Sequence, residues 1–550
     1  MAALSQMDSA ALAASPVHLP GRALRWTTAN VDEGLPGIIT PITWSMYFPP
    51  TESTMRDCWV DLGVLPESKR AIPEEIDGRF LSVVFGHAIG NVDLMGQMAA
   101  AVPGGRAAAM EEQLFGSVSG EVGEPKGLAK IRRYPQVLVK SPIAIRRALK
   151  RHALLAAETD IWWRRSVFDT ELGPRESVAA LVGARQHFER VLGVHMVLSM
   201  AAQAIFTQVE ALAARAGHPG LGGEVIKSEE GTTEFGLVRD LWRLSDGTTT
   251  LDAFLRTHGY HGPREGLVDS VVWREKPSSL HELAEAYRSR RGSEGIDEVA
   301  IRRRHEQRIA QDRLESGLGR IGISLSRKII SFASRIPEWR ETGRAGILKS
   351  VDVARHAHRV IGRDMAERGL LDDPADCRFL TIDELNLFSN GKLEPGTVPA
   401  LVAQRRQHHQ AYSSIDLPHV WRGVPPVEVP ERDGGESPRD CREITGIGVS
   451  AGVAEGVVHV VLDLDEADCF DGNEPIVMVC RATDPSWASL FPLAVAVVTD
   501  VGSQMSHAAI VCRELGLPCI ANTRTGTSML RNGMRVRVDA NTGVVTVLDR

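Results

Sequence analysis

The segment from Arg422 to Glu443 divides the chain into two parts with different hydrophobic periodicity. It reads RGVPPVEVPERDGGESPRDCRE and is rich in proline, glycine and charge, with little to bury. Before it, apolar residues recur at three- and four-residue spacing, as in 177–215, which indicates amphipathic helices. After it, short runs rich in β-branched residues indicate strands. We therefore predict separate domains joined by a linker.

At 550 residues the chain is too long for one hydrophobic core. We expect a mainly α-helical domain followed by a compact α/β domain. The predicted parts are a flexible leader at 1–24, the helical domain at 25–422, a linker at 423–443 and the α/β domain at 444–550. In the α/β domain, strand-like runs surround one helix that begins at His507, and Asn541-Thr542-Gly543 predicts a tight hairpin in the last run.

Composition excludes several classes of protein. The net charge of −7 argues against nucleic-acid binding driven by overall charge. The seven cysteines are scattered without CxxC spacing, which fits a reducing cytosol and neither a disulfide framework nor a zinc site. The N-terminus lacks the pattern of a signal peptide, and no apolar run approaches the ~18 residues of a membrane span. We expect a cytoplasmic protein that binds neither membrane nor nucleic acid.

No metal site is expected either. His408 and His409 look like a metal-binding pair, but adjacent residues of a helix point to different sides, so a solvated helical face is favoured.

His507 is the residue whose setting most suggests chemistry. Gly502 permits a turn that side chains would crowd, and Ser503 and Ser506 offer hydroxyl groups beside it. The first N–H groups of the following helix have no intrahelical partner and attract anions. A phosphoryl group on the imidazole would meet these donors. The alternative is that His507 only caps the helix or packs against it.

The stretch TDVGSQMSHAAIVCRELGLPCIANT, 499–523, resembles the swivelling phosphohistidine domain of phosphoenolpyruvate-utilising enzymes. That family includes phosphoenolpyruvate synthase, pyruvate phosphate dikinase and rifampin phosphotransferase. The resemblance continues in 446–458, 480–500 and 533–547, and so covers the whole α/β domain. It implies that His507 is phosphorylated and carries the group between two active sites. Ser503 departs from the pattern, because the family usually has a second glycine there.

The helical part looks like the substrate-binding region of rifampin phosphotransferase-like proteins, which implies a hydroxylated small molecule as acceptor. The residues that carry this resemblance are 25–47, 78–95, 258–277 and 379–388. No ATP-grasp pattern and no P-loop precede or interrupt them. We therefore expect no cofactor within this chain, and a separate ATP-grasp subunit, with ATP and Mg²⁺ bound to it, that charges His507 in trans.

The loop GYHGPREG, 259–266, is the best candidate for the acceptor chemistry. His261 or Glu265 would take the hydroxyl proton, and Arg264 would clamp phosphoryl oxygens. The alternative is a turn whose charges pair with each other. A second turn, NVDEGLPGIITP, offers Asn30 and Glu33 as substrate contacts, although a purely structural turn explains it equally well.

Two other functions fit the same sequence. One is a non-catalytic phosphohistidine carrier or regulatory protein. The other is a dikinase-like enzyme with a diverged ATP site inside 100–350.

Overall fold

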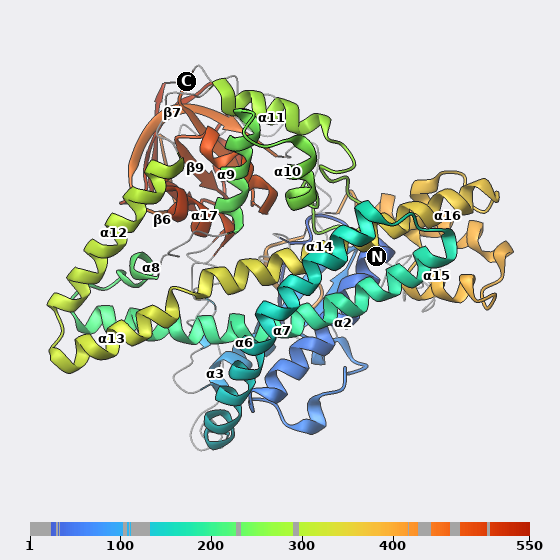
Figure 1. Cartoon of the computed structure of the whole chain (residues 1–550), viewed down its shortest axis with the longest axis horizontal. Coiled ribbons are helices and arrows are strands. Elements are labelled where there is room, and N and C mark those ends of the chain that lie inside the picture. Colours follow the sequence, from blue (N-terminus) through green and yellow to red (C-terminus); the bar gives the residue numbers. More distant parts are fainter. Residues whose placement is uncertain are drawn as a thin grey trace.

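The structure is a computed structural model. It describes residues 24–28, 31, 34–102, 107–108, 111, 133–226, 233–289, 296–415, 417–426, 442–462, 474–483, 485–502 and 506–549. A mainly helical part is followed by a C-terminal α/β sheet domain, as expected (Figure 1). Most of the predicted leader and of the predicted linker lies outside the described residues.

Four long helices form the centre of the helical part. They are α2 (Pro41–Asp61), α6 (Tyr134–Arg164), α7 (Pro174–Arg215) and α14 (Ile336–Glu367). Helices α7 and α14 make the most extensive helix pair, and two glycines of α14 lie closely against side chains of α7. A Cβ atom at Gly346 would lie 3.0 Å from a methyl carbon of Val191, and one at Gly343 would overlap the ring of His195. The buried faces enclose an apolar core that includes Trp163, Phe188 and Ala354.

Shorter helices surround this centre. They are α3 (Val92–Ala101), α8 (Gly222–Val225), α9 (Thr233–Ser245), α10 (Leu251–His258), α11 (Ser278–Ser289), α12 (Ile296–Ser316), α13 (Arg320–Ala333), α15 (Ile382–Ser389) and α16 (Val398–Tyr412). Short 3₁₀ or π segments are η1 (Glu67–Lys69), η2 (Ile76–Gly78), η3 (Arg165–Asp169), η4 (Pro374–Phe379) and η5 (Pro395–Thr397). Side-chain caps fix several of their ends; Thr381 and Glu384 form a capping box at α15.

The helical part also contains a small antiparallel sheet that the sequence analysis missed. Its order is β2 (Leu81–Val84), β3 (His87–Asn91), β1 (Arg25–Thr27) and β4 (Val420–Arg422). Trp26 pairs with Trp421, so the start of the helical part is joined to its end. Strands of three residues carry too little pattern to be predicted, and their pairing spans almost the whole domain.

The described part of the α/β domain forms an eight-stranded sheet of order β5-β12-β11-β7-β8-β9-β10-β6. The strands are β5 (Glu443–Thr445), β6 (Ile447–Ser450), β7 (Val453–Val460), β8 (Ile476–Cys480), β9 (Ala496–Thr499), β10 (Cys519–Ala521), β11 (Arg535–Asp539) and β12 (Val544–Asp549). Strands β7 to β10 pair in parallel, and β8 is buried throughout, as expected for a strand covered on both faces. Strands β11 and β12 form the predicted hairpin.

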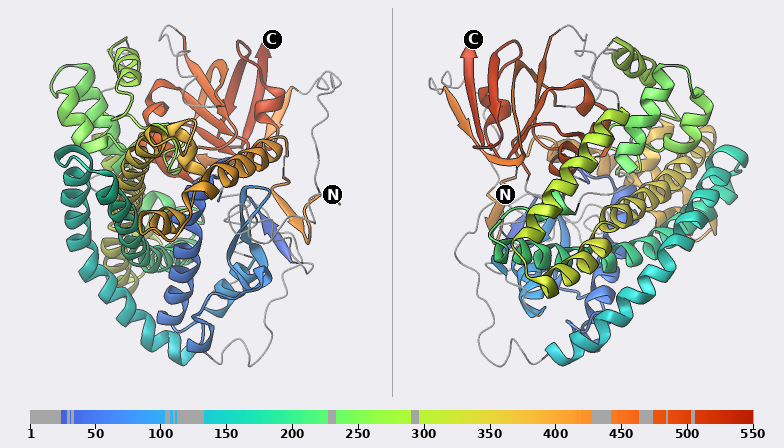
Figure 2. Two further views of the ribbon diagram at one scale, coloured as in Figure 1. Left: turned by 90° about the vertical axis from the view of Figure 1, so that its right-hand side faces the viewer. Right: turned by 60° about the vertical axis from the view of Figure 1, so that its left-hand side comes forward.

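Helix α17 (His507–Leu515) contacts strands β6 and β10 of the sheet and helix α9 of the helical part. Figure 2 shows the α/β domain above the helical part from two sides. The shorter segments η7 (Pro485–Ser489), η8 (Phe491–Leu493) and α18 (Gly526–Met529) complete the domain. One apolar cluster joins α17, η7 and η8 to α9 and α11, and it includes Leu241, Tyr287, Phe491 and Val511. The Tyr287 hydroxyl donates to the Ser489 carbonyl over 2.7 Å. The α/β domain is therefore seated on α9 and α11 in this structure.

Helix α7 corrects one expectation. An 18-residue window of this 42-residue helix has a mean hydropathy of 1.4, so by length and composition it meets the criteria for a membrane span. The sequence analysis found no such run. A single helix of this kind is weak evidence for a span, because a core helix of a soluble protein meets the same criteria, and α7 packs against α14, α2 and α6.

Candidate functional site

His507 is the first residue of α17 and follows Gly502 by five positions. Gly502 has φ of 152°, and a Cβ atom there would lie 3.1 Å from both the Ala521 Cβ and the Ser506 Oγ. Glycine is therefore required at position 502, where the backbone approaches β10 closely. Ser506 has extended backbone angles at the N-cap position and is buried. Ser503 lies outside the described residues.

The two ring nitrogens of His507 have different surroundings. Nδ1 lies 3.2 Å from the Thr483 hydroxyl oxygen, whereas Nε2 is buried and has no hydrogen-bond partner among the described residues. In the tautomer whose Nδ1–H donates to Thr483, Nε2 carries the free lone pair. Burial lowers the pKa of His507 well below its usual value, and the positive charge of Arg344 lowers it further. The ring is neutral, as a nitrogen nucleophile must be.

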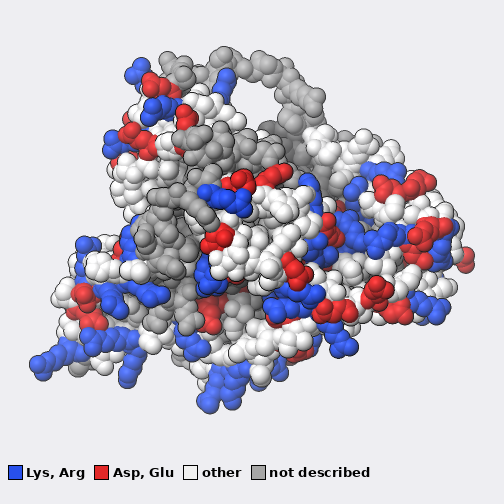
Figure 3. Space-filling model, turned by 45° about the horizontal axis from the view of Figure 1, so that its top comes forward, with Lys and Arg blue, Asp and Glu red and all other residues white. Residues whose placement is uncertain are grey.

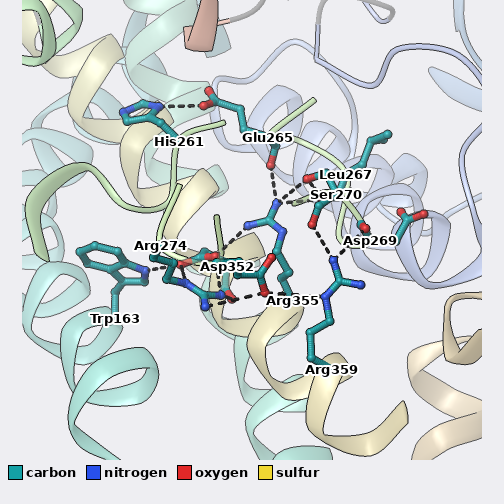
Figure 4. A network of polar contacts seen from close by, with 11 residues as sticks. Trp163, His261, Glu265, Leu267, Asp269, Ser270, Arg274, Asp352, Arg355 and Arg359 are labelled. Atoms are coloured by element: carbon teal, nitrogen blue, oxygen red, sulfur yellow. Dashed lines mark hydrogen bonds and ion pairs between the residues drawn. The ribbon is translucent and has the colours of Figure 1, made fainter. Parts of the chain in front are cut away.

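His261 and Glu265 form a buried pair in the loop after α10. The His261 Nδ1 lies 2.7 Å from the Glu265 Oε2 (Figure 4). The His261 Nε2 and the Glu265 Oε1 have no hydrogen-bond partner within the described ranges. Gly262, with φ of 154°, brings the loop against Val272, where a Cβ atom would lie 2.9 Å from the Val272 Cα. The loop geometry thus depends on this glycine.

Burial shifts both members of this pair toward their neutral forms. It raises the pKa of Glu265 to about 8, although the nearby cations Arg344 and Arg355 oppose the shift. It lowers the pKa of His261 to about 3, and Lys349 and Arg344 lower it further. Below pH 8 the pair therefore holds its proton on the carboxyl group, which donates to Nδ1. Once Glu265 ionises, the pair can accept a proton.

A buried ionic network on α14 fixes the position of this loop. The Arg355 guanidinium donates to the backbone carbonyls of Glu265 and Leu267, each over 2.8 Å (Figure 4). Asp352 accepts from Arg355 over 2.7 Å and from Arg274 over 2.8 Å. Asp352 and Arg355 are both fully buried, so the geometry of the loop is set from the core of the helical part.

Arg264 does not share this environment. Its side chain is exposed, and its φ of 51° turns the chain between the buried residues on either side. The structure thus brings His261 and Glu265 together and places Arg264 toward solvent. Asn30 and Glu33 lie outside the described residues.

Arg344 on α14 is a cation that the sequence analysis did not single out. It is half-buried, and its charge acts on His507, His261 and Glu265 alike. Within the part of the chain that the structure describes, it has no ion pair or hydrogen bond. A cation whose charge acts on two imidazoles with unpartnered nitrogens is suited to hold an anion there. No local motif marks Arg344, because its neighbours in the site come from distant parts of the sequence.

A mainly apolar pocket adjoins this group. Its lining includes Ile510, one turn after His507 on α17, and Glu341, one turn before Arg344 on α14. The remaining lining residues are Ala202, Phe206, Gly223, Ile226, Ile336, Arg340, Arg513 and Glu514. The described residues contain no group of three or more His, Cys, Asp or Glu side chains that could hold a metal ion.

Comparison with known protein families identifies two parts of the chain. Residues 472–543 match the family described as PEP-utilising enzyme, mobile domain. Residues 205–341 match the family described as Rifampicin phosphotransferase fourth domain. The first match includes His507 and the second includes His261 and Glu265. The resemblance expected from the sequence is thus confirmed for both parts.

Curated relatives give the same picture over longer stretches. A rifampicin phosphotransferase of a Streptomyces species is 26% identical over 442 residues, which cover 78% of this chain and 48% of that protein. A rifampicin phosphotransferase of Bacillus subtilis is 25% identical over 335 residues, which cover 59% of this chain and 37% of that protein. The uncharacterized phosphotransferase YvkC of Bacillus subtilis is 36% identical over 197 residues, which cover 34% of this chain and 23% of that protein. The chain spans about half or less of the length of these relatives.

Proposed function

We propose that this chain is the carrier and acceptor part of a phosphotransferase, in which His507 carries a phosphoryl group and passes it to a hydroxyl of a small molecule. One observation carries the proposal. The unpartnered Nε2 of His507 is seated in the same electrostatic neighbourhood as the His261–Glu265 pair and Arg344. A carrier, a proton acceptor and a cation are the groups that phosphoryl transfer to an alcohol requires.

The transfer step follows from these positions. The acceptor oxygen attacks phosphorus, a P–O bond forms, and the bond between phosphorus and the His507 Nε2 breaks. The hydroxyl proton goes to the His261–Glu265 pair in its ionised form. Nε2 keeps the electron pair of the broken bond, and His507 leaves as a neutral imidazole whose Nδ1–H stays with Thr483. Arg344 and the first N–H groups of α17 neutralise the phosphoryl oxygens during transfer.

The acceptor in this proposal is a hydroxylated molecule with an apolar body. The pocket that includes Ile510, one turn after His507, has apolar walls and four charged residues, and such a mixture is usual for a small-molecule site. Rifampicin, named in two of the relatives, is the first compound to test.

The phosphoryl donor in this proposal is a separate ATP-grasp protein that holds ATP and Mg²⁺. His507 is only 4% exposed where it is seated, so the α/β domain must leave α9 and α11 before a donor protein reaches the ring. The Pro/Gly-rich connection at 423–443 suits such a movement.

The experiment separates loading from transfer. The full chain is loaded with phosphoramidate, a small chemical donor of phosphoryl groups, and the loss of His507 label to rifampicin or simple alcohols is followed. His507→Ala must remove the label. His261→Ala must keep the label and slow its transfer to the alcohol.

Other results would point to the alternatives. Label that no alcohol accepts, in wild type and variants alike, would favour the non-catalytic carrier. Binding of ATP by the isolated chain would favour a dikinase-like enzyme with its own nucleotide site.

A further inference from the structure

Helix α6 presents a row of large apolar side chains to solvent. Val139, Ile143, Leu154 and Ile161 are between 56% and 75% exposed, although α6 packs its opposite face on α7 and α14. The helix forms an outer edge of the molecule in both views of Figure 2. Exposed aliphatic residues are normal singly, but several on one helix face mark a contact surface.

These residues belong to one continuous row at three- and four-residue spacing, which places them on the same side of the helix. Arg146 and Lys150 lie in the middle of the same row, between Ile143 and Leu154. The full row is Val139, Ile143, Arg146, Lys150, Leu154, Ala157 and Ile161. This pattern is typical of a seam that receives a second helix, with two cations at its centre.

The charge of this face is one-sided. From Tyr134 to Ala157 the helix has five Lys or Arg residues and no Asp or Glu, in a chain whose net charge is −7. The carboxylates that follow, Glu158 and Asp160, form ion pairs with Arg190 and Lys349. Arg146, Arg147 and Lys150 form no ion pair within the described ranges. On the face drawn in Figure 3, by contrast, basic and acidic side chains are largely interspersed. The occupant of the α6 face must therefore supply carboxylates.

The position of the two cations within the apolar row argues against two of the possible binding partners of this face. A second copy of α6 would set Arg146 and Lys150 against the same cations, and like charges in contact repel. An anionic membrane would receive the apolar row in its acyl region, but a membrane-surface helix keeps its charges off that row. Here Arg146 and Lys150 lie within it. A helix of another protein can cover the apolar side chains of the row with its own apolar side chains. Its carboxylates, placed opposite Arg146 and Lys150, can pair with these two cations.

We propose that the exposed face of α6 docks an amphipathic helix of an acidic partner protein, with aliphatic residues along its seam and carboxylates opposite Arg146 and Lys150. The site lies on the far side of α6 from its packing against α7 and α14. It is therefore independent of the phosphoryl chemistry proposed above.

The test uses a labelled synthetic helical peptide that carries leucines at the seam spacing and glutamates opposite Arg146 and Lys150. Its affinity for the full chain is measured by fluorescence anisotropy. The double variant Arg146→Glu, Lys150→Glu is expected to weaken binding about tenfold, and the wild-type affinity is expected to fall with salt. The matched control is Arg304→Glu, Arg308→Glu on α12, two exposed arginines at the same spacing, for which a change below about twofold is expected.

Three results would overturn the proposal. Equal binding of the peptide to wild type and to the α6 variant would show that the seam is not the site. Saturable binding of the wild type to phosphatidylserine vesicles, lost in the α6 variant, would assign the face to a membrane. A dimer that the same variant dissociates would assign it to a second copy of the chain. All the substituted side chains are exposed, so both variants are expected to fold. Circular dichroism checks this.

Discussion

The imidazole of His261 lies 2.7 Å from the carboxyl group of Glu265, and both side chains are buried. Burial disfavours an ionised carboxylate and raises the pKa of Glu265 to about 8, so the carboxyl group keeps its proton at neutral pH. A base for phosphoryl transfer must lose that proton before it can accept another from the acceptor hydroxyl. The pair is consequently controlled by pH.

The rate of phosphoryl transfer from His507 is expected to rise with pH and to level off above about pH 8, because the pKa of Glu265 is raised to about 8 and only its ionised form makes the pair a base. Glu265→Gln should remove this pH dependence and slow transfer by about 10²-fold to 10⁴-fold. The measurement is the decay of His507 label in the presence of an alcohol between pH 6 and 9. A variant with the wild-type profile would exclude Glu265 as the titrating group.

Arg344 is expected to matter more than Arg264. Arg344→Ala removes a cation whose charge acts on His507, His261 and Glu265 alike and should slow transfer by roughly 10²-fold, since preorganised charge stabilises a phosphoryl group in transit. Arg344→Lys should recover part of the rate because it keeps the charge. Arg264→Ala should change transfer by less than about threefold, because that side chain is exposed. The measurement is the rate of transfer for each variant at the same loading of His507. A larger loss in Arg264→Ala than in Arg344→Ala would show that Arg264 holds the phosphoryl group.

The sequence indicated those parts of the candidate site that are local. Gly502, His507 and the start of α17 lie within a few residues, and His261 and Glu265 are four apart, so each pattern can be read directly. Arg344 was not found, because it belongs to a core helix far along the chain from both. The β1–β4 pairing was missed for the same reason, since nothing near Trp26 indicates Trp421.

Thr483 is expected to hold His507 in the reactive tautomer. Thr483→Val removes the only described hydrogen-bond partner of the His507 Nδ1 at nearly constant side-chain volume. The tautomer with its proton on Nε2, which has no free lone pair there, is then no longer disfavoured. Loading of His507 by phosphoramidate should fall about tenfold. Thr542→Val, in the turn between β11 and β12, is the control and should load normally. Mass spectrometry of the intact chain measures both, and equal loading would show that Thr483 only packs against the ring.

Asp352 is expected to be a major stabilising residue. Asp352→Ala leaves Arg274 and Arg355 buried without their carboxylate, and breaking a buried ion pair in this way costs about 3–5 kcal/mol. The loss should appear as a lower midpoint in urea unfolding. Asp383→Ala, which breaks an ion pair with Arg185 on a side chain that is 61% exposed, should cost less than about 1 kcal/mol. Similar losses would mean that the buried network contributes no more than a surface pair.

The seating of the α/β domain on α9 and α11 is expected to limit access to His507. Tyr287→Phe removes one hydroxyl, which donates to the Ser489 carbonyl across the seat, and leaves the aromatic packing in place. A hydrogen bond of this kind contributes about 0.5–1.5 kcal/mol, so the unseated population should rise about twofold to tenfold. Chemical loading of His507, which is 4% exposed when seated, should accelerate by the same factor. Tyr134→Phe on α6 is the control with no expected change. If Tyr287→Phe loads at the wild-type rate, the seat does not control access, and phosphoramidate reaches the ring by another path.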